Sequence, residues 1–268
     1  MSIPTPRKFD VDLSAVPRHW LAGSPVATAI SNGINMLFPH GERFFVRSVK
    51  RYLDQIEDPG LRDQVKAFFK QEGHHASAHD DFNQILRDQG FEIDRFLGCY
   101  KAISSWLEKT MPAKLNLAGT AAAEHFTAIL AEGAFEQGIL DVLDPSVMQL
   151  LAWHAAEEIE HKAVAFDVLQ EVDPSYALRV AGLVYATVTL ASFWVWGTTV
   201  LLRQEKLPWR QTLAELRRDQ KQDPVVRRVF VRGIRQYLRR TFHPSDNAND
   251  GLAAAWFAAH GFKLPEAA

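Results

Sequence analysis

The sequence predicts an all-α fold with a four-helix bundle at its centre. Long stretches show the apolar spacing of helices, and no alternating run of apolar and polar residues is long enough for a strand. Four Asp-Pro pairs each stand just before such a stretch, where Asp accepts hydrogen bonds from free N–H groups and Pro suits the first turn. Of the 268 residues, 47% are apolar, which indicates a globular chain and excludes a disordered one.

The chain is expected to form nine helical segments. The first contains Pro39-His40-Gly41, which should kink or break it. The Asp-Pro pairs at Asp58, Asp144, Asp173 and Asp223 mark the starts of four others. In order, the segments are 25–56, 60–89, 93–110, 115–138, 145–171, 174–204, 208–220, 224–241 and 250–261.

Two pairs of these helices carry acids and histidines in similar places. Glu72 and His75 are three residues apart, and so are Glu158 and His161, so each pair shares one helix face. In the preceding helix of each pair, a glutamate stands in apolar or small surroundings: Glu42 in LFPHGERFFV and Glu124 in GTAAAEHFTAIL.

This arrangement is typical of a dinuclear metal site in a helical bundle, where two helices supply one Glu each and two supply Glu-x-x-His. Four carboxylates balance the four positive charges of two divalent ions, and carboxylates can bridge two metals. Without metal, four buried acids would repel one another or take up protons. The alternative, ordinary solvated helix residues, fits poorly with Glu124 after three alanines and Glu158 beside Trp153 and Ile159.

Other residues near the motifs are candidates for ligand, supporting or core roles. His154 lies one turn before Glu158 and is a third histidine ligand or else a supporting core residue. His79 either supports a ligand or lies at the surface, and Glu157 and Glu160 face other helices or solvent. His74 and His125 point away from the ligand face, which indicates structural roles. Aromatic residues near the motifs should form the core, and a minority should line a substrate channel; they include Phe38, Phe44, Phe45, Phe68, Trp106, Phe126, Trp153 and Phe166.

Several segments resemble a known family. FPHGERFF, QEGHHASAHD, WHAAEEIEHKAVAFDV and FHPSDN are similar to segments of the bacterial predicted metal-dependent hydrolases, and the resemblance covers roughly residues 15–262. It implies a ferritin-like fold, whereas the word hydrolase in the family's name is itself a prediction.

The metal-binding pattern also resembles that of the di-iron arylamine N-oxygenases, such as p-aminobenzoate N-oxygenase. Those enzymes share four Glu, two Glu-x-x-His histidines and a third His one turn before the last Glu. By position, this resemblance implies the ligand set Glu42, Glu72, His75, Glu124, His154, Glu158 and His161.

The function that these observations favour is a di-iron enzyme that activates O₂ to oxidise a small apolar or aromatic organic substrate. An Mn/Fe pair fits the same ligands. An external electron donor is implied, because the lone Cys99 cannot hold an iron–sulfur cluster and also excludes a disulfide framework. A dinuclear metal-dependent hydrolase is the alternative. Metal storage is disfavoured by the extra histidine and the additional C-terminal helices.

The C-terminal third differs in character from the rest, so two parts are expected: the metal-binding bundle in 1–175 and further helices in 176–268. Residues 180–202 contain no charge and, as a helix, would be about 35 Å long, enough to cross a bilayer core of about 30 Å. Residues 203–240 follow with a net charge of +8, against −10 for the rest.

A single membrane span would place the metal site outside the cell, because basic flanks prefer the cytoplasm. Two interpretations of the apolar segment therefore remain: burial in an enlarged bundle or homodimer interface, and peripheral contact of 180–240 with a membrane. Nucleic acid is not expected, because apolar residues interrupt the basic ones. The start of the chain lacks the apolar segment of a secretory signal, so a cytoplasmic location is the default, with membrane association as an option.

Overall fold

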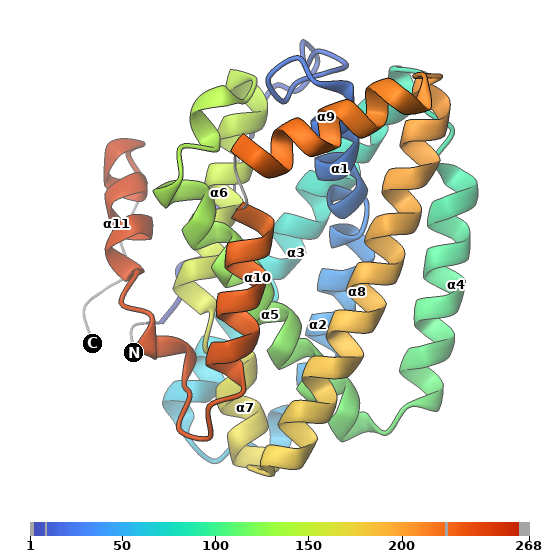
Figure 1. The fold of residues 1–268 in the computed structure, drawn as a ribbon. Coiled ribbons are helices and arrows are strands. Elements are labelled where there is room, and N and C mark those ends of the chain that lie inside the picture. Colours follow the sequence, from blue (N-terminus) through green and yellow to red (C-terminus); the bar gives the residue numbers. More distant parts are fainter. Residues whose placement is uncertain (1–2, 9, 223–224, 263–268) are drawn as a thin grey trace.

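The computed structural model describes residues 3–8, 10–222 and 225–262. In these residues the fold is all-α, as predicted, with eleven α-helices and no strand (Figure 1). An isolated bridge joins Leu21 to Leu143. The α-helices are α1 (Pro25–Asn35), α2 (Phe38–Lys50), α3 (Pro59–Asp88), α4 (Asp94–Thr110), α5 (Ala113–Glu136), α6 (Pro145–His161), α7 (Val164–Val172), α8 (Tyr176–Glu205), α9 (Trp209–Gln222), α10 (Val225–Tyr237) and α11 (Asp250–Ala259). Short 3₁₀ turns cover Leu53–Gln55, Leu140–Val142 and Pro244–Asp246.

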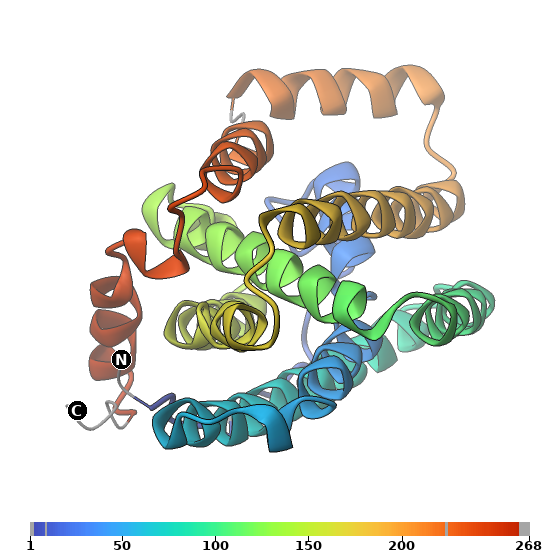
Figure 2. The ribbon, with the colours of Figure 1, turned by 90° about the horizontal axis from the view of Figure 1, so that it is seen from below.

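Helices α2, α3, α5 and α6 pack in a closed ring. Helix α2 packs against α3 and α5, and α6 packs against the same two helices. Helix α5 lies near the centre of the molecule, with α8 on one side and α7 on another (Figure 2). Buried apolar residues such as Phe68, Phe126 and Trp153 fill the space between these helices. The ring therefore encloses an interior into which four separate helices can direct side chains.

Two of the predicted helices are interrupted. The segment 25–56 breaks at Met36-Leu37, ahead of the predicted step, because Pro39 stands in the first turn of α2, where a missing N–H costs nothing. The segment 145–171 was expected to be continuous but turns at Lys162-Ala163. Neither Gly nor Pro marks this turn, which directs the buried Lys162 ammonium to the backbone oxygen of Asn247 and the side chains of Asn249 and Asp250.

The predicted Asp-Pro caps are confirmed at two positions. Asp58 and Asp144 accept hydrogen bonds from the N–H groups of the residues at the starts of α3 and α6. At the third position the prediction is wrong: Ser175 caps α8, and Asp173 instead accepts from the backbone of Ser175 and from Lys114. The fourth pair, Asp223-Pro224, lies outside the described residues.

Helix α8 covers α1 and α5 with one side only. Its inward positions include Gly182, Leu183, Ala186, Phe193 and Gly197. The most apolar window of α8 is only 28% buried, so the helix is not enclosed in the way that a core helix is. Among the described residues, α8 is the one helix whose length and composition would allow it to cross a membrane. Helix α10 packs on α5, and α11 packs on α6.

Candidate metal centre

All seven predicted metal-ligating residues meet inside the helical ring. Helix α2 supplies Glu42, α3 supplies Glu72 and His75, α5 supplies Glu124, and α6 supplies His154, Glu158 and His161. None of these residues is more than 4% exposed. The spacing of three and four residues on α3 and α6 places the ligands of each helix on one face, as expected. Ligand atoms from these residues form overlapping groups whose members all lie within 4.8 Å of one another.

Most carboxylate oxygens of the cluster are buried without a hydrogen-bond partner. Both oxygens of Glu42, Glu72 and Glu124 have no hydrogen-bond partner, and neither has Oε2 of Glu158. Buried polar atoms are almost always satisfied, and an unsatisfied buried charge is expensive. Buried carboxylate oxygens that lack hydrogen-bond donors and converge from four helices are suited to binding cations. A purely structural role would not explain why they lack partners.

His75 and His161 each direct one ring nitrogen into the cluster and keep the other in a hydrogen bond. Nε2 of His75 lies 3.0 Å from Glu157, while its Nδ1 lies 3.6 Å from Glu72 without a hydrogen bond. Nδ1 of His161 lies 3.0 Å from Gln71 Oε1, while its Nε2 lies 3.2 Å from Glu72 and 3.3 Å from Glu124. A proton donated to the outer partner leaves the inner nitrogen with a free lone pair, which is the form of histidine that binds metal.

His154 is held in the same way by a second histidine. Its Nδ1 lies 2.6 Å from Nε2 of His79, and Nδ1 of His79 lies 2.6 Å from Asn35 Oδ1. If Asn35 accepts from His79, then His79 accepts from His154, and Nε2 of His154 turns its lone pair to the cluster, 2.9 Å from Glu158. His79 is fully buried, so the option of a surface role is wrong, and it can itself join Glu42 and His154 around an ion.

Burial and mutual repulsion perturb the acids of the cluster. Burial and then the charges of the neighbouring acids raise the pKa of Glu42 and Glu72 well above its usual range, and raise that of Glu124 to about 7. Burial also opposes ionisation of Glu158, but the charge of His161, when its ring is protonated, outweighs it and holds the pKa of Glu158 low. Without a cation, this crowding favours protonated acids, and ionisation of all four carboxyl groups needs compensating positive charge.

A second layer of charge supports the histidines from the N-terminal segment. Arg7 is 6% exposed; its backbone N–H donates to Glu157, and its guanidinium reaches Glu157 and Glu160 at 3.4 and 3.0 Å. Gln71 donates to Glu160 and accepts from His161. Glu157 therefore contacts Arg7 and His75, whereas Glu160 contacts Arg7 and Gln71. Nothing in the sequence indicated a role for Arg7. The only indication for Gln71 was its position next to Glu72.

The histidines expected to be structural lie away from the cluster's carboxylates. His125 is buried and its Nε2 bonds to the backbone oxygen of Gly233 on α10, while Nδ1 of His74 bonds to the backbone oxygen of Arg7. His243, in the FHPSDN segment, pairs with Asp167 at 2.7 Å and caps the turn that follows.

An apolar pocket reaches the cluster at Glu42. Its volume is about 120 Å³, and helices α1, α2, α4, α5 and α8 line it. Some of the aromatic residues expected near a substrate channel line this pocket: Phe38, Phe44, Phe45 and Phe126. Trp106, which was expected in the core or the channel, is instead 59% exposed. The described lining residues include no Lys or Arg. The pocket therefore suits an apolar molecule with one edge beside the Glu42 carboxyl group.

Comparison with known proteins gives one family. Residues 5–248 match the family described as predicted metal-dependent hydrolase. No curated protein and no solved structure gives a significant match to the chain. The match confirms the first resemblance seen in the sequence; the likeness to arylamine N-oxygenases stays a prediction. The family's description agrees with hydrolysis better than with oxidation.

Proposed function

The chain belongs to the family of predicted metal-dependent hydrolases, and we propose that it is a dinuclear metal enzyme of ferritin-like architecture that acts on a small apolar substrate. Glu42, Glu72, Glu124, Glu158, His75, His154 and His161 hold two metal ions in this proposal. The reaction we favour is O₂-dependent oxidation at two iron ions, with electrons from an external donor. Two iron ions held by these residues would supply the redox chemistry that O₂ activation needs, with the external donor keeping them reduced.

The observation that carries the proposal is the state of the donor atoms. Three histidines each have one nitrogen fixed by an outer partner and the other turned to the carboxylates, and seven carboxylate oxygens lack any hydrogen-bond donor. Four carboxylates and three neutral histidines bring a charge of −4, which balances two divalent cations. Outer partners of this kind orient metal-binding histidines and raise their basicity.

The pocket explains why we favour an apolar substrate. Its hydroxyl groups are largely committed: Tyr100, Ser104, Thr127 and Thr189 donate to backbone carbonyls. One polar group of the lining is free: Nε2 of His40 is buried without a hydrogen-bond partner. Burial also lowers the pKa of the His40 ring to about 4, so the ring is neutral. A neutral His40 can hold one polar group of a substrate while the aromatic walls exclude water.

The same features weigh against hydrolysis of charged substrates. An anionic substrate would bring negative charge beyond that which two metal ions and four carboxylates balance, so it would need a further cation to bind it. The described lining of this pocket offers neither an Arg nor a Lys for that purpose.

Hydrolysis of an uncharged substrate is the second candidate, and the family's description is the specific observation in its favour. Two metal ions can lower the pKa of a bound water and stabilise a tetrahedral transition state. Both candidates need the same ligand set, so the metal and the co-substrate distinguish them.

Metal content and the response to O₂ test the proposal. The protein is freed of metal with chelator, reloaded anaerobically with Fe²⁺, and mixed with O₂ while its absorption spectrum is followed. We expect two irons per chain and a transient visible band. Glu124→Ala should lose iron, whereas Glu136→Ala, an exposed residue on the same helix, should bind it as the wild type does.

Two other results would redirect or end the proposal. Turnover of neutral esters or amides by the zinc- or manganese-loaded protein under argon, with no response of the iron-loaded protein to O₂, would favour the hydrolase. Failure of the folded wild type to bind any of these metals would refute a dinuclear centre.

A further inference from the structure

Helix α8 presents a long apolar stripe to the outside of the molecule. Val184, Val188 and Val195 are 57%, 58% and 66% exposed, at the spacing of one helix face, and Trp196, which is 37% exposed, borders this face. Small residues continue the stripe between them, and from Val180 to Leu202 no charged residue interrupts it. Solvent-facing helix positions of a protein without a further binding surface carry polar residues, so this face has another use.

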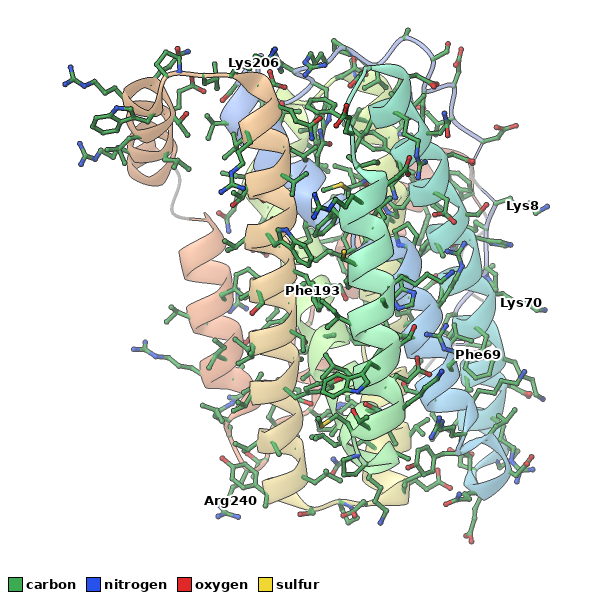
Figure 3. All side chains as sticks on the ribbon, turned by 90° about the vertical axis from the view of Figure 1, so that its right-hand side faces the viewer. Lys8, Phe69, Lys70, Phe193, Lys206 and Arg240 are labelled. Atoms are coloured by element: carbon green, nitrogen blue, oxygen red, sulfur yellow. The ribbon has the colours of Figure 1, made fainter. Side chains whose placement is uncertain are left out.

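The neighbouring helix extends this surface. Helix α4 runs beside α8 (Figure 3), where the ring of Phe96 on α4 lies 5.1 Å from that of Trp196. On α4, Ile103 and Trp106 are 41% and 59% exposed. We call the exposed residues Val184, Val188, Val195, Trp196, Ile103 and Trp106 the outer apolar face.

Cations stand at both ends of the stripe. Arg203, Lys206 and Arg210 are exposed at its C-terminal end. At the other end, the guanidinium of Arg240 lies 4.4 Å from the ring of Tyr176, in the first turn of α8. Figure 3 shows Lys206 and Arg240 at opposite ends of α8.

Nearby acids do not cancel this charge, because most of them are already paired. Glu205 binds Arg18 and His19, Glu108 binds Arg47, and Asp94 binds Arg87. An apolar strip with positive ends complements the hydrocarbon edge and phosphates of an anionic lipid leaflet. Tryptophans such as Trp106 and Trp196 are the side chains that favour this interface.

The apolar pocket lies directly behind this face. Tyr185 and Thr189 line the pocket and directly follow the exposed Val184 and Val188 along α8, and Phe193 lines the pocket one turn further on. Phe193 lies between α8 and α4, with its ring 4.7 Å from that of Tyr100 (Figure 3). The gap between these two helices is therefore filled by side chains that form both the pocket wall and the inner side of the outer apolar face.

We propose that the outer apolar face lies on the surface of an anionic lipid bilayer and that the pocket takes a lipid-soluble substrate from it. The contact is peripheral, because α1 and α5 cover the inner side of α8, and because the buried Arg179 donates a hydrogen bond to the backbone oxygen of Arg239 rather than facing lipid. A second copy of the chain fits less well, since antiparallel pairing of two such stripes would bring positive ends together. The substrate route depends on the proposed function, whereas the docking does not.

Vesicle flotation tests the docking with the intact protein. We expect the wild type to float with phosphatidylcholine vesicles that contain one third phosphatidylglycerol and to float much less with phosphatidylcholine alone. Brominated lipids in the same vesicles should quench part of the tryptophan fluorescence, because Trp106 and Trp196 would touch the acyl chains while Trp20 and Trp153 are buried.

Matched variants separate the apolar and charged contributions. Val188→Asp/Val195→Asp should weaken vesicle binding about tenfold or more, because two exposed side chains would carry charge into lipid. Arg203→Gln should weaken binding to the anionic vesicles about fivefold, the effect of one cation at the surface. Val142→Asp, at a position 51% exposed outside this face, should bind like the wild type.

The outcomes are decisive in either direction. Absence of wild-type flotation and of quenching would overturn the proposal, and so would a stable dimer that Val188→Asp/Val195→Asp converts to monomer without any vesicle binding. Neither readout needs metal or turnover. A protein that docks but binds no metal would refute the proposed function alone, and one that binds iron but never docks would refute this inference alone.

Discussion

Glu124→Gln should change how the stability of the metal-free protein depends on pH. Burial, and next the charge of Glu158, raise the pKa of Glu124 from 4.5 to about 7. Between these values the folded protein holds a proton that the unfolded chain has lost, so the contribution of this carboxyl to stability is complete below pH 4.5 and disappears as the pH rises to 7. From about pH 5 to about pH 7 the wild type should lose about 2 kcal/mol relative to the variant, whose amide does not titrate.

Urea unfolding of chelator-treated protein, followed by circular dichroism across this range, measures the effect. Only the difference between two proteins counts, because other buried groups titrate in both; burial, for example, lowers the pKa of His75 and His79 and gives a slope of opposite sign. The exposed Glu136→Gln is the matched control and should run parallel to the wild type. If Glu124→Gln also ran parallel, the carboxyl would not lie in a crowded, buried site, and the reasoning would be refuted.

Four further changes test other parts of the structure. Gly182→Ala should destabilise the protein by about 1–3 kcal/mol in urea unfolding, because a Cβ there would lie 2.5 Å from the backbone of α5. Its control, Gly98→Ala, has nothing within 4 Å of the added Cβ and should stabilise the protein by about 0.5–1 kcal/mol. Equal effects of the two substitutions would contradict the packing of α8 on α5. His79→Phe should weaken metal binding about 10–100-fold in a chelator competition, since it removes the partner that orients the third histidine ligand; unchanged affinity would exclude that role. Arg7→Met should cost about 3–5 kcal/mol in urea unfolding, because it leaves the buried side chains of Glu157 and Glu160 without their cation; a loss below about 1 kcal/mol would show that these ion pairs contribute little to stability. Thr189→Trp should lower kcat/KM about tenfold by filling the pocket while metal content stays normal, and full activity would place the substrate elsewhere.

The sequence predicted the residues of the candidate site well because its ligands follow local rules. Glu72 and His75, or Glu158 and His161, share a face whenever their segment is helical, and the helices were marked by apolar spacing and by caps such as Asp144. The structure then brings the four helices together, as the need to bury and neutralise four acids required. Their role as metal ligands remains a prediction.

Features that depend on distant partners could not be predicted. His79 looked equally suited to the surface, because its contacts with Asn35 and His154 join three different helices. The turn after His161 has no Gly or Pro and is associated with a lysine that binds residues near position 250. The apolar segment 180–202 had open alternatives because length and hydropathy do not reveal that one side of a helix is packed and the other bare.

The ion pairs of Arg7 with Glu157 and Glu160 affect the order in which parts of the protein can fold. These partners are separated by about 150 positions in sequence, so the segment around Arg7 leaves the ribosome long before α6 exists. The ion pairs of Arg7 therefore cannot form until α6 has been synthesised. Closure of so long a loop is slow. The hydrogen bonds that orient His75 and His161 through Glu157, Glu160 and Gln71 are therefore completed late in folding.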